Sequence, residues 1–306
     1  MEKLDNQAVV FTKPVHHLNM PLSAEQLAGK TQEFLEAKGF SIVYRKKVSG
    51  PELAERDVIK QHYLMYSKAA CVSSADELSL SDEAQIRFLS AYGKVWQEEV
   101  EAGNILGFPA IQEMKGISAA ELQVLWSTKF DDKQTQKIQD GLLLAYLEQF
   151  GCFCINAFYP AMEENFYNTA TEMTYFVVEF DPDQTSWKQF RKAILGVTDS
   201  SKADSKSFRG QLYATYGDAL EYPGRDNFVH GSAGPVEGLI ERMIHEPDFD
   251  MKMNPVGQYL LGRGVPQECF KAWKSVQTIS QLGALFDKTE EKNTREALGS
   301  LDGIAF

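Results

Sequence analysis

The sequence predicts an α+β protein built on an antiparallel four-stranded sheet in the split βαβ arrangement, with helices over one face. Short apolar segments near 8–11, 40–47, 173–180 and before His230 have the character of strands. Segments with helical spacing separate them. The resulting order is strand, helix, strand, helix, insertion, helix, strand, helix, loop, strand, helix, which fits this arrangement.

The first elements have clear boundaries. Ala8 to Phe11 is apolar, and Pro14 stops the strand. Ser23 to Gln26 is a capping box that opens a helix through Lys38, and Gly39 ends it. Phe40 to Lys47 alternates as a strand does, and Pro51 to Tyr66 has helical spacing.

From about residue 69 the pattern changes, and we expect a helical insertion over 69–155. Its helices are predicted over Ser81–Ala102, Ser118–Phe130 and Lys133–Phe150. Its core is predicted to hold the large aromatic residues Trp96, Phe108 and Trp126, because such side chains are usually buried.

From 156 onward, segments with strand and helix patterns alternate again. We expect a helix over Phe158–Tyr167, a strand over Met173–Phe180 and a helix from the Ser186 cap through Leu195. Pro235 to Ile244 reads as a helix with proline in its first turn. A C-terminal helical extension over 256–306 is predicted to hold one helix over Pro266–Phe286.

Composition limits the classes of function. With 306 residues, 43% of them hydrophobic, a packed core is expected. The formal net charge of −12 argues against nucleic acid or anionic membrane as a partner, since both call for a basic face. The lack of a charged-then-apolar leader or a long apolar run leads us to expect a cytoplasmic protein.

The cysteines predict neither disulfides nor a metal site. None of Cys71, Cys152, Cys154 and Cys269 has a Cys-x-x-Cys partner. Cys152-Phe153-Cys154 alternates as a strand or buried segment does, so we interpret it as core.

The most informative segment runs from Arg225 to Ala233 and contains His230. This histidine ends a short apolar strand and is followed by Gly231 and Ser232. Glycine would leave room for an approaching phosphate, so His230 is a candidate nucleophile. Upstream, the polar loop from Gly196 to Gly210 offers Thr198 and Arg209, whose hydroxyl and guanidinium groups suit phosphate oxygens.

Together these segments resemble the nucleoside diphosphate kinase family. The family pattern has a strand ending in Lys-Pro, then Leu-Gly-x-Thr and Ala-Asp-Ser with a following Arg-Gly, then Asn-x-x-His-Gly-Ser. Matching segments occur here in the same order: Val9–Pro14, Leu195–Thr198, Ala203–Gly210 and Asn227–Ser232. The resemblance covers residues 6–68 and 156–250. It implies a ferredoxin-like fold in which residues 1–68 and 156–255 form one discontinuous domain.

The resemblance implies transfer of the γ-phosphate of a nucleoside triphosphate to a nucleoside diphosphate, by a ping-pong mechanism through phosphorylated His230. Magnesium would arrive with ATP or another triphosphate, held by the phosphates and not by a protein cage. Roles carried over by position fall on Lys13 (ribose and transferring phosphate), Tyr63 (near the histidine), Thr198 (β-phosphate), Arg209 (γ-phosphate), Asn227 (ribose), and Phe158 with Met162 (base clamp).

Two positions stay open. Counting back from Gly196 places Lys192 where the family has a second phosphate-binding arginine, with Arg191 one residue away. The glutamate that fixes the histidine tautomer, steadied by Ser232, corresponds to Glu241 or Arg242. Arg242 at that place would cripple the site, whereas Glu241 would leave it intact. The family's Lys-Pro-Asp is Lys13-Pro14-Val15 here and its Arg-Gly-Asp is Arg209-Gly210-Gln211, so two carboxylates are missing.

Three functions therefore remain. The first is an active nucleoside diphosphate kinase that binds nucleoside di- and triphosphates and forms a homo-oligomer. The second is a weak or silent relative retained as a structural subunit of a larger assembly, such as that of a cilium or axoneme. The third is a phosphohistidine relay or a regulatory nucleotide sensor.

Overall fold

The computed structural model describes residues 4–72, 74–131, 134–220, 222–265, 267–268 and 285–301. It divides into one unit of residues 1–58 and 166–306 and a second unit of residues 59–165. The second unit is thus ten residues longer at each end than the insertion predicted from the sequence, and residues beyond 255 belong to the first unit.

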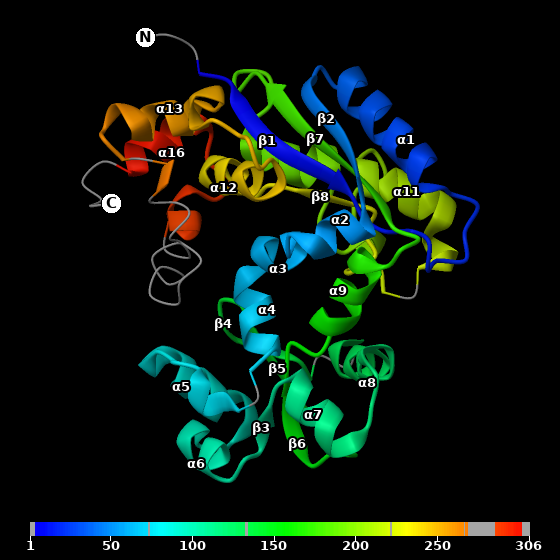
Figure 1. Cartoon of the computed structure of the whole chain (residues 1–306), viewed down its shortest axis with the longest axis vertical. Coiled ribbons are helices and arrows are strands. Elements are labelled where there is room, and N and C mark those ends of the chain that lie inside the picture. Colours follow the sequence, from blue (N-terminus) through cyan, green and yellow to red (C-terminus); the bar gives the residue numbers. More distant parts are fainter. Residues whose placement is uncertain are drawn as a thin grey trace. The chain divides into compact units, whose positions relative to one another are not determined.

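The first unit contains an antiparallel four-stranded sheet with the order β2-β7-β1-β8, which confirms the predicted sheet (Figure 1). Its strands are β1 (Asn6–Thr12), β2 (Ser41–Ser49), β7 (Glu172–Phe180) and β8 (Val229–Gly231). Its helices are α1 (Ala24–Ala37), α2 (Gly50–Glu55), α10 (Trp187–Gln189), η2 (Phe190–Leu195), η3 (Ser200–Lys202), α11 (Phe208–Tyr216), η4 (Gly217–Ala219), α12 (Pro235–His245), η5 (Met251–Met253), α13 (Pro255–Gly262) and α16 (Thr294–Ser300).

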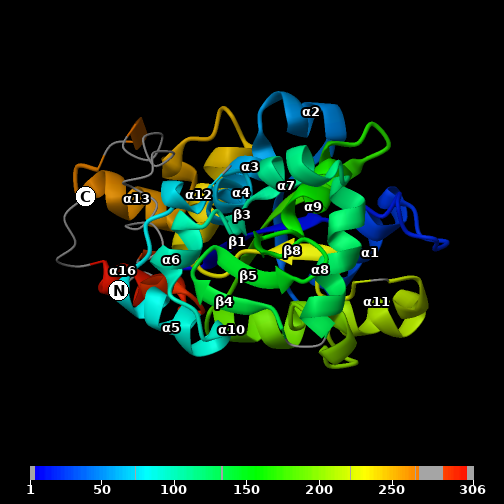
Figure 2. The ribbon, with the colours of Figure 1, turned by 90° about the horizontal axis from the view of Figure 1, so that it is seen from below.

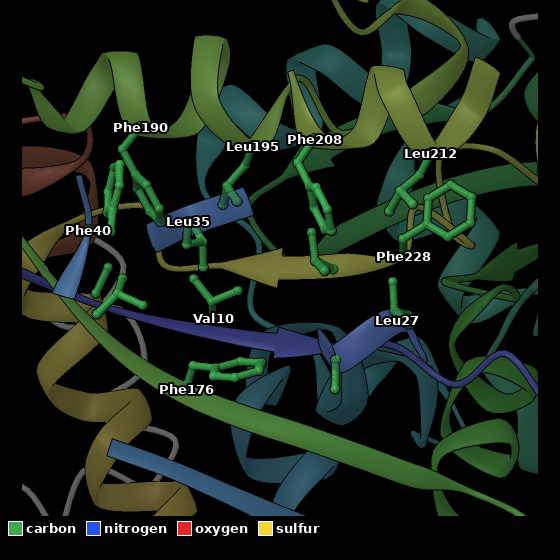
Figure 3. Close-up of a cluster of buried hydrophobic side chains, with 14 of the residues drawn as sticks. Val10, Leu27, Leu35, Phe40, Phe176, Phe190, Leu195, Phe208, Leu212 and Phe228 are labelled. Carbon is green, nitrogen blue, oxygen red and sulfur yellow. The ribbon is translucent and has the colours of Figure 1, made fainter. Parts of the chain in front are cut away.

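One face of this sheet packs against α1, η2 and α11. Val10 and Phe176 are paired across β1 and β7, and both are fully buried in the cluster that Figure 3 shows. The helices contribute Leu27, Leu35, Phe190, Leu195, Phe208 and Leu212 to the same cluster. Burial of these large apolar side chains fixes the helices over the sheet.

The opposite face is covered as well, which corrects the prediction of helices over one face only. The central strand β1 is buried at every position, so both of its faces need a cover. Helix α12 supplies it: the rings of Phe11 and Tyr175 contact His245, with centroids 5.4 and 4.8 Å away. Two NH groups of Arg56 donate to the carbonyls of Ile244 and His245 and satisfy the end of α12.

The second unit holds a mixed four-stranded sheet with the order β3-β6-β5-β4. Its elements are α3 (Val58–His62, which starts at the boundary), α4 (Leu64–Ala70), η1 (Ala75–Glu77), α5 (Asp82–Tyr92), α6 (Trp96–Glu101), β3 (Ile105–Leu106), α7 (Phe108–Lys115), α8 (Ala119–Asp131), β4 (Gln136–Gln139), β5 (Leu142–Leu147), β6 (Cys152–Ile155) and α9 (Tyr159–Tyr167). Helix α9 ends in the first unit.

The predicted helix over Lys133–Phe150 is wrong, because β4 and β5 form a hairpin there (Figure 2). Asp140 and Gly141 are its two-residue turn, and Gly141 has a φ of 73°. Asp-Gly is a strong hairpin signal. The apolar run of β5 that follows it has no strand alternation, and from the sequence we therefore interpret it as part of a helix. The core prediction is confirmed for Trp96 and Trp126, which are buried, and for β6, in which Cys152 and Cys154 are buried.

Beyond α12, an apolar cluster joins α12, α13 and α16 through Leu239, Leu260 and Leu298. The predicted helix over Pro266–Phe286 lies almost entirely outside the described residues. Within the described part of the chain, none of the helices has the length and apolar character that a bilayer span requires.

Candidate active site around His230

Strand pairing decides which way His230 points. It pairs with Phe11 of β1, so the two side chains share a face, and their rings stack with centroids 4.6 Å apart. This is the face that α12 covers. Gly231 pairs with Val10 and faces the other way, where an added Cβ would lie 2.2 Å from Leu195 Cδ1. The glycine therefore makes room for Leu195, and the prediction that it clears a path for phosphate is wrong.

The backbone just before His230 is strained. Phe228 has a φ of 67°, a region that bulky residues rarely adopt, and its side chain is buried. Its carbonyl accepts a hydrogen bond from the Lys13 N–H at 2.7 Å. Strain of this kind persists where the surroundings over-determine a conformation, and it is concentrated at functional sites.

Glu241 of α12 holds the imidazole. Its Oε1 lies 2.6 Å from His230 Nε2, and its Oε2 accepts from the Ser232 hydroxyl at 2.5 Å. The Ser232 oxygen accepts in turn from the Val9 N–H at 2.8 Å. Arg242 points elsewhere, to Gln7 and Glu246. The structure thus places Glu241, and not Arg242, against the histidine.

This geometry assigns the tautomer. A carboxylate that accepts from both Ser232 and His230 puts the imidazole proton on Nε2, so we infer that the lone pair is on Nδ1. Burial lowers the pKa of His230 well below its ordinary value, and the positive charges of Lys13, Arg209 and Arg191 lower it further. With its pKa lowered in this way, the ring is neutral at physiological pH.

Lys13 follows β1 and lies within electrostatic reach of the histidine. Its ammonium group donates to the Arg225 carbonyl at 2.9 Å. Burial lowers the pKa of Lys13 to about 7, helped by Arg209 and Arg225 and opposed by Asp226. This lysine therefore changes charge near neutral pH.

Arg209 and Asn227 tie the loops of the site together. Arg209, in the first turn of α11, donates to the carbonyls of Gly196 and Val229 at 2.5 and 2.7 Å. Asn227 donates to the carbonyls of Thr198 and Gly224 at 2.7 and 3.1 Å. The Thr198 residue is exposed. Among the residues that the structure describes, the buried Oδ1 of Asn227 has no hydrogen-bond partner, so it is an acceptor in want of a donor.

The two candidates for the second phosphate-binding cation are both engaged by carboxylates. Arg191 lies 2.5 Å from Glu290 and 3.3 Å from Glu291, and Lys192 lies 3.0 Å from Glu291. Both lie in η2, a π-helix with wider turns than an α-helix. Counting four residues back from Gly196 as if along an α-helix therefore does not identify which of the two side chains is directed toward the site. Arg191 is the one whose charge acts on His230.

Three sequence-predicted site residues belong to the second unit. Tyr63 lies at the junction of α3 and α4, with its ring centroid 4.6 Å from that of His62. Phe158 is half-buried, and its ring centroid lies 5.7 Å from that of Tyr66. Met162 is buried within α9.

Sequence reasoning missed several charged residues near the site. Glu237, one turn before Glu241, accepts from the Ala233 N–H, and burial beside Glu241 raises its pKa to about 8. Asp226 binds Arg225, and the pair Glu290 and Glu291 binds the two cations of η2. Arg225 and Asp226 belong to the same segment as His230, so their position in the sequence could have indicated that they lie near the site. Nothing in the sequence indicated that Glu290 pairs with Arg191.

The comparisons with known proteins find similarity to solved structures alone. No protein-family model matches the chain, and no curated protein does. Among the solved structures that match is the crystal structure of an NDP kinase from Pyrobaculum aerophilum, with 15% sequence identity over 78% of this chain and 94% of that chain. Its TM-score of 0.34 is too low for the match to bear on function.

Proposed function

We propose that this chain is a nucleoside diphosphate kinase that transfers the γ-phosphate of a nucleoside triphosphate to a nucleoside diphosphate through phosphorylated His230. The observation that carries the proposal is the hydrogen-bonded series His230–Glu241–Ser232, with contacts of 2.6 and 2.5 Å. Glu241 and Ser232 are buried, whereas His230 is half-buried. A neutral imidazole with a fixed tautomer beside three cations suits attack on a phosphate.

In the first half-reaction, Nδ1 of His230 would form a bond to the γ-phosphorus while the bond from that phosphorus to the bridging oxygen breaks. The nucleoside diphosphate leaves with the electron pair. Glu241 keeps the Nε2 proton in place and balances the positive charge that develops on the ring. In the second half-reaction, a terminal oxygen of another nucleoside diphosphate attacks the phosphorus and Nδ1 leaves.

Lys13 and Arg209 would offset the charge of the transferring phosphate, because phosphoryl transfer depends on positioning and charge neutralisation. The unsatisfied Oδ1 of Asn227 supports a role in binding a ligand hydroxyl. The nucleotide contacts that the sequence predicts for Thr198, Tyr63, Phe158 and Met162 stay predictions.

Magnesium would arrive with the nucleotide and offset part of the negative charge of its phosphates. This mode asks for no ligand from the protein, and it leaves in place the contacts of Glu241 with His230 and Ser232 and of Glu237 with the Ala233 N–H. The homo-oligomer and the cytoplasmic location stay predictions.

A second function, a silent nucleotide-binding or structural subunit, is favoured by one observation. Arg191 and Lys192, which could bind the β-phosphate, are paired with Glu290 and Glu291. If these pairs persist with nucleotide present, binding would be weak and transfer slow.

Initial rates with ATP and GDP as the varied pair separate the two functions. The kinase predicts parallel double-reciprocal lines and loss of transfer in His230→Ala. His16→Ala removes another histidine of the same unit and is expected to transfer normally. No transfer by the wild type, with nucleotide binding retained, would favour the silent subunit.

A further inference from the structure

Asp226, in the turn before β8, is a buried carboxylate without a role in the function proposed above. It is 6% exposed. Its two oxygens accept from Nε and Nη2 of Arg225 at 2.7 and 2.8 Å, and His17 Nε2 lies 3.5 Å from Oδ1. Burial alone would raise the pKa of Asp226, but hydrogen bonds from His17 and Arg225 lower it, so the group is ionised.

The turn around Asp226 is closed by its own contacts. The N–H groups of Arg225 and Asp226 both donate to the Tyr222 carbonyl, at 2.9 and 2.8 Å. The Arg225 guanidinium lies over the Tyr222 ring, 4.6 Å from its centroid. With its side chain held by Asp226, Arg225 presents its carbonyl to the Lys13 ammonium group. Asp226 therefore fixes the residue that positions Lys13.

The charges around Lys13 give Asp226 a second effect. Arg209 on α11 and Arg225 in the turn disfavour the protonated lysine, whereas Asp226 favours it. His17 pairs with Asp226, and His230 on β8 is neutral. Val15, two residues after Lys13, is buried and apolar and contributes no charge. Asp226 thus brings to this cluster of cations a negative charge from a distant part of the chain.

We propose that Asp226 is a positioning residue for Lys13 in phosphoryl transfer: it fixes the carbonyl that binds the ammonium group and supplies the negative charge that these cations require. The proposal rests on the proposed function, in which Lys13 must be protonated to act on a phosphate. Its physical part, the link between Asp226 and Lys13, holds whether or not the chain transfers phosphate.

The link is measured on the whole chain without nucleotide, from the pH dependence of Lys13 acetylation by acetic anhydride, read by mass spectrometry. Asp226→Asn is expected to lower the pKa of Lys13 by about one unit, because an opposite charge is lost from a buried cluster. Arg225→Ala is expected to raise it by a similar amount. General loosening would admit water and raise the pKa in both variants, so the opposite signs distinguish the electrostatic link from damage.

The catalytic part is measured from kcat/KM against pH. In Asp226→Asn the fall in kcat/KM on the alkaline side should move to lower pH by about one unit, the same shift as that of Lys13. Asp226→Glu keeps the negative charge, so kcat/KM should fall at the same alkaline pH as in the wild type. Glu246→Gln is the matched control, since it removes another largely buried carboxylate that is paired with an arginine. It should leave the pH at which kcat/KM falls unchanged.

A Lys13 pKa that stays the same or rises in Asp226→Asn overturns the proposal. If that variant does not fold, Asp226→Ser replaces it and is judged by the same sign: a lowered pKa of Lys13 supports the proposal, and an unchanged or raised one overturns it. A wild type that transfers no phosphate removes the proposed function but leaves the acetylation result to test the link.

Discussion

The two halves of the candidate site differ in what satisfies their polar groups. In the nucleophile half, His230, Glu241 and Ser232 contact one another and the adjacent strand. In the cation half, Lys13 and Arg209 donate to backbone carbonyls, and Arg191 pairs with the carboxylates of Glu290 and Glu291. The nucleophile is thus preorganised, whereas the anion-binding groups are occupied by the protein and a phosphate must compete for them.

The largest effect is expected in the nucleophile half. Glu241→Ala removes the carboxylate that fixes the tautomer, and kcat should fall about 10²- to 10⁴-fold, as for other groups of this kind. Single-turnover phosphorylation of the protein measures it. Glu237→Gln alters the neighbouring buried carboxylate and should cost less than tenfold. Equal losses in the two variants would contradict a special role for Glu241.

The next largest effect is expected in the pH dependence of kcat/KM, because the two halves of the site titrate differently. His230 has a lowered pKa and stays neutral as the pH falls toward 6, whereas Lys13, with a pKa of about 7, loses its charge as the pH rises. We expect kcat/KM to fall about tenfold per pH unit above pH 7 and to change little between pH 6 and 7. A fall on the acidic side of pH 7 would contradict these assignments.

Ser232→Ala should have a smaller effect on catalysis and a clear one on stability. It removes the acceptor of the buried Val9 N–H and the hydroxyl that donates to Glu241, which costs about 1–3 kcal/mol of unfolding free energy. Urea denaturation measures this, and kcat should fall only about tenfold. Unchanged stability would show that another group replaces the hydroxyl.

The smallest effect is expected from releasing the cations of η2. Glu290→Gln with Glu291→Gln should lower KM for ADP several-fold at low salt, because partly exposed ion pairs contribute about 1 kcal/mol or less. Glu98→Gln with Glu113→Gln makes the same charge change on exposed residues of the second unit. Equal KM changes in both double variants would mean that net charge, and not the pairing, is responsible.

Much of the first unit could be predicted from its sequence because local patterns agree with the fold there. Apolar segments bounded by Pro14, Gly39 and the Ser186 cap predicted the strands and helices. The Asn227 to Ser232 segment predicted His230 as a site residue. Strand pairing places this histidine on the face where Glu241 contacts it, and the charges of Lys13 and Arg209 act on it.

The remaining features depend on tertiary structure. The apolar run of β5 has no periodicity of its own, so only the Asp140-Gly141 turn distinguished a strand from a helix there. The choice between Glu241 and Arg242 depended on how α12 packs on the sheet. The pairing of Arg191 with Glu290 joins residues 99 positions apart, which no local pattern predicts. The reason for Gly231, contact with Leu195, required the sheet faces to be known.

The central claim is that His230 accepts a phosphate on Nδ1. The most direct test incubates the chain with ATP labelled in the γ-phosphate, digests it at alkaline pH and locates the phosphate by mass spectrometry and ³¹P NMR. The account predicts one acid-labile phosphate, on Nδ1 of His230, that GDP removes as GTP. Phosphate on another residue, on Nε2, or on none while ATP is bound would contradict it.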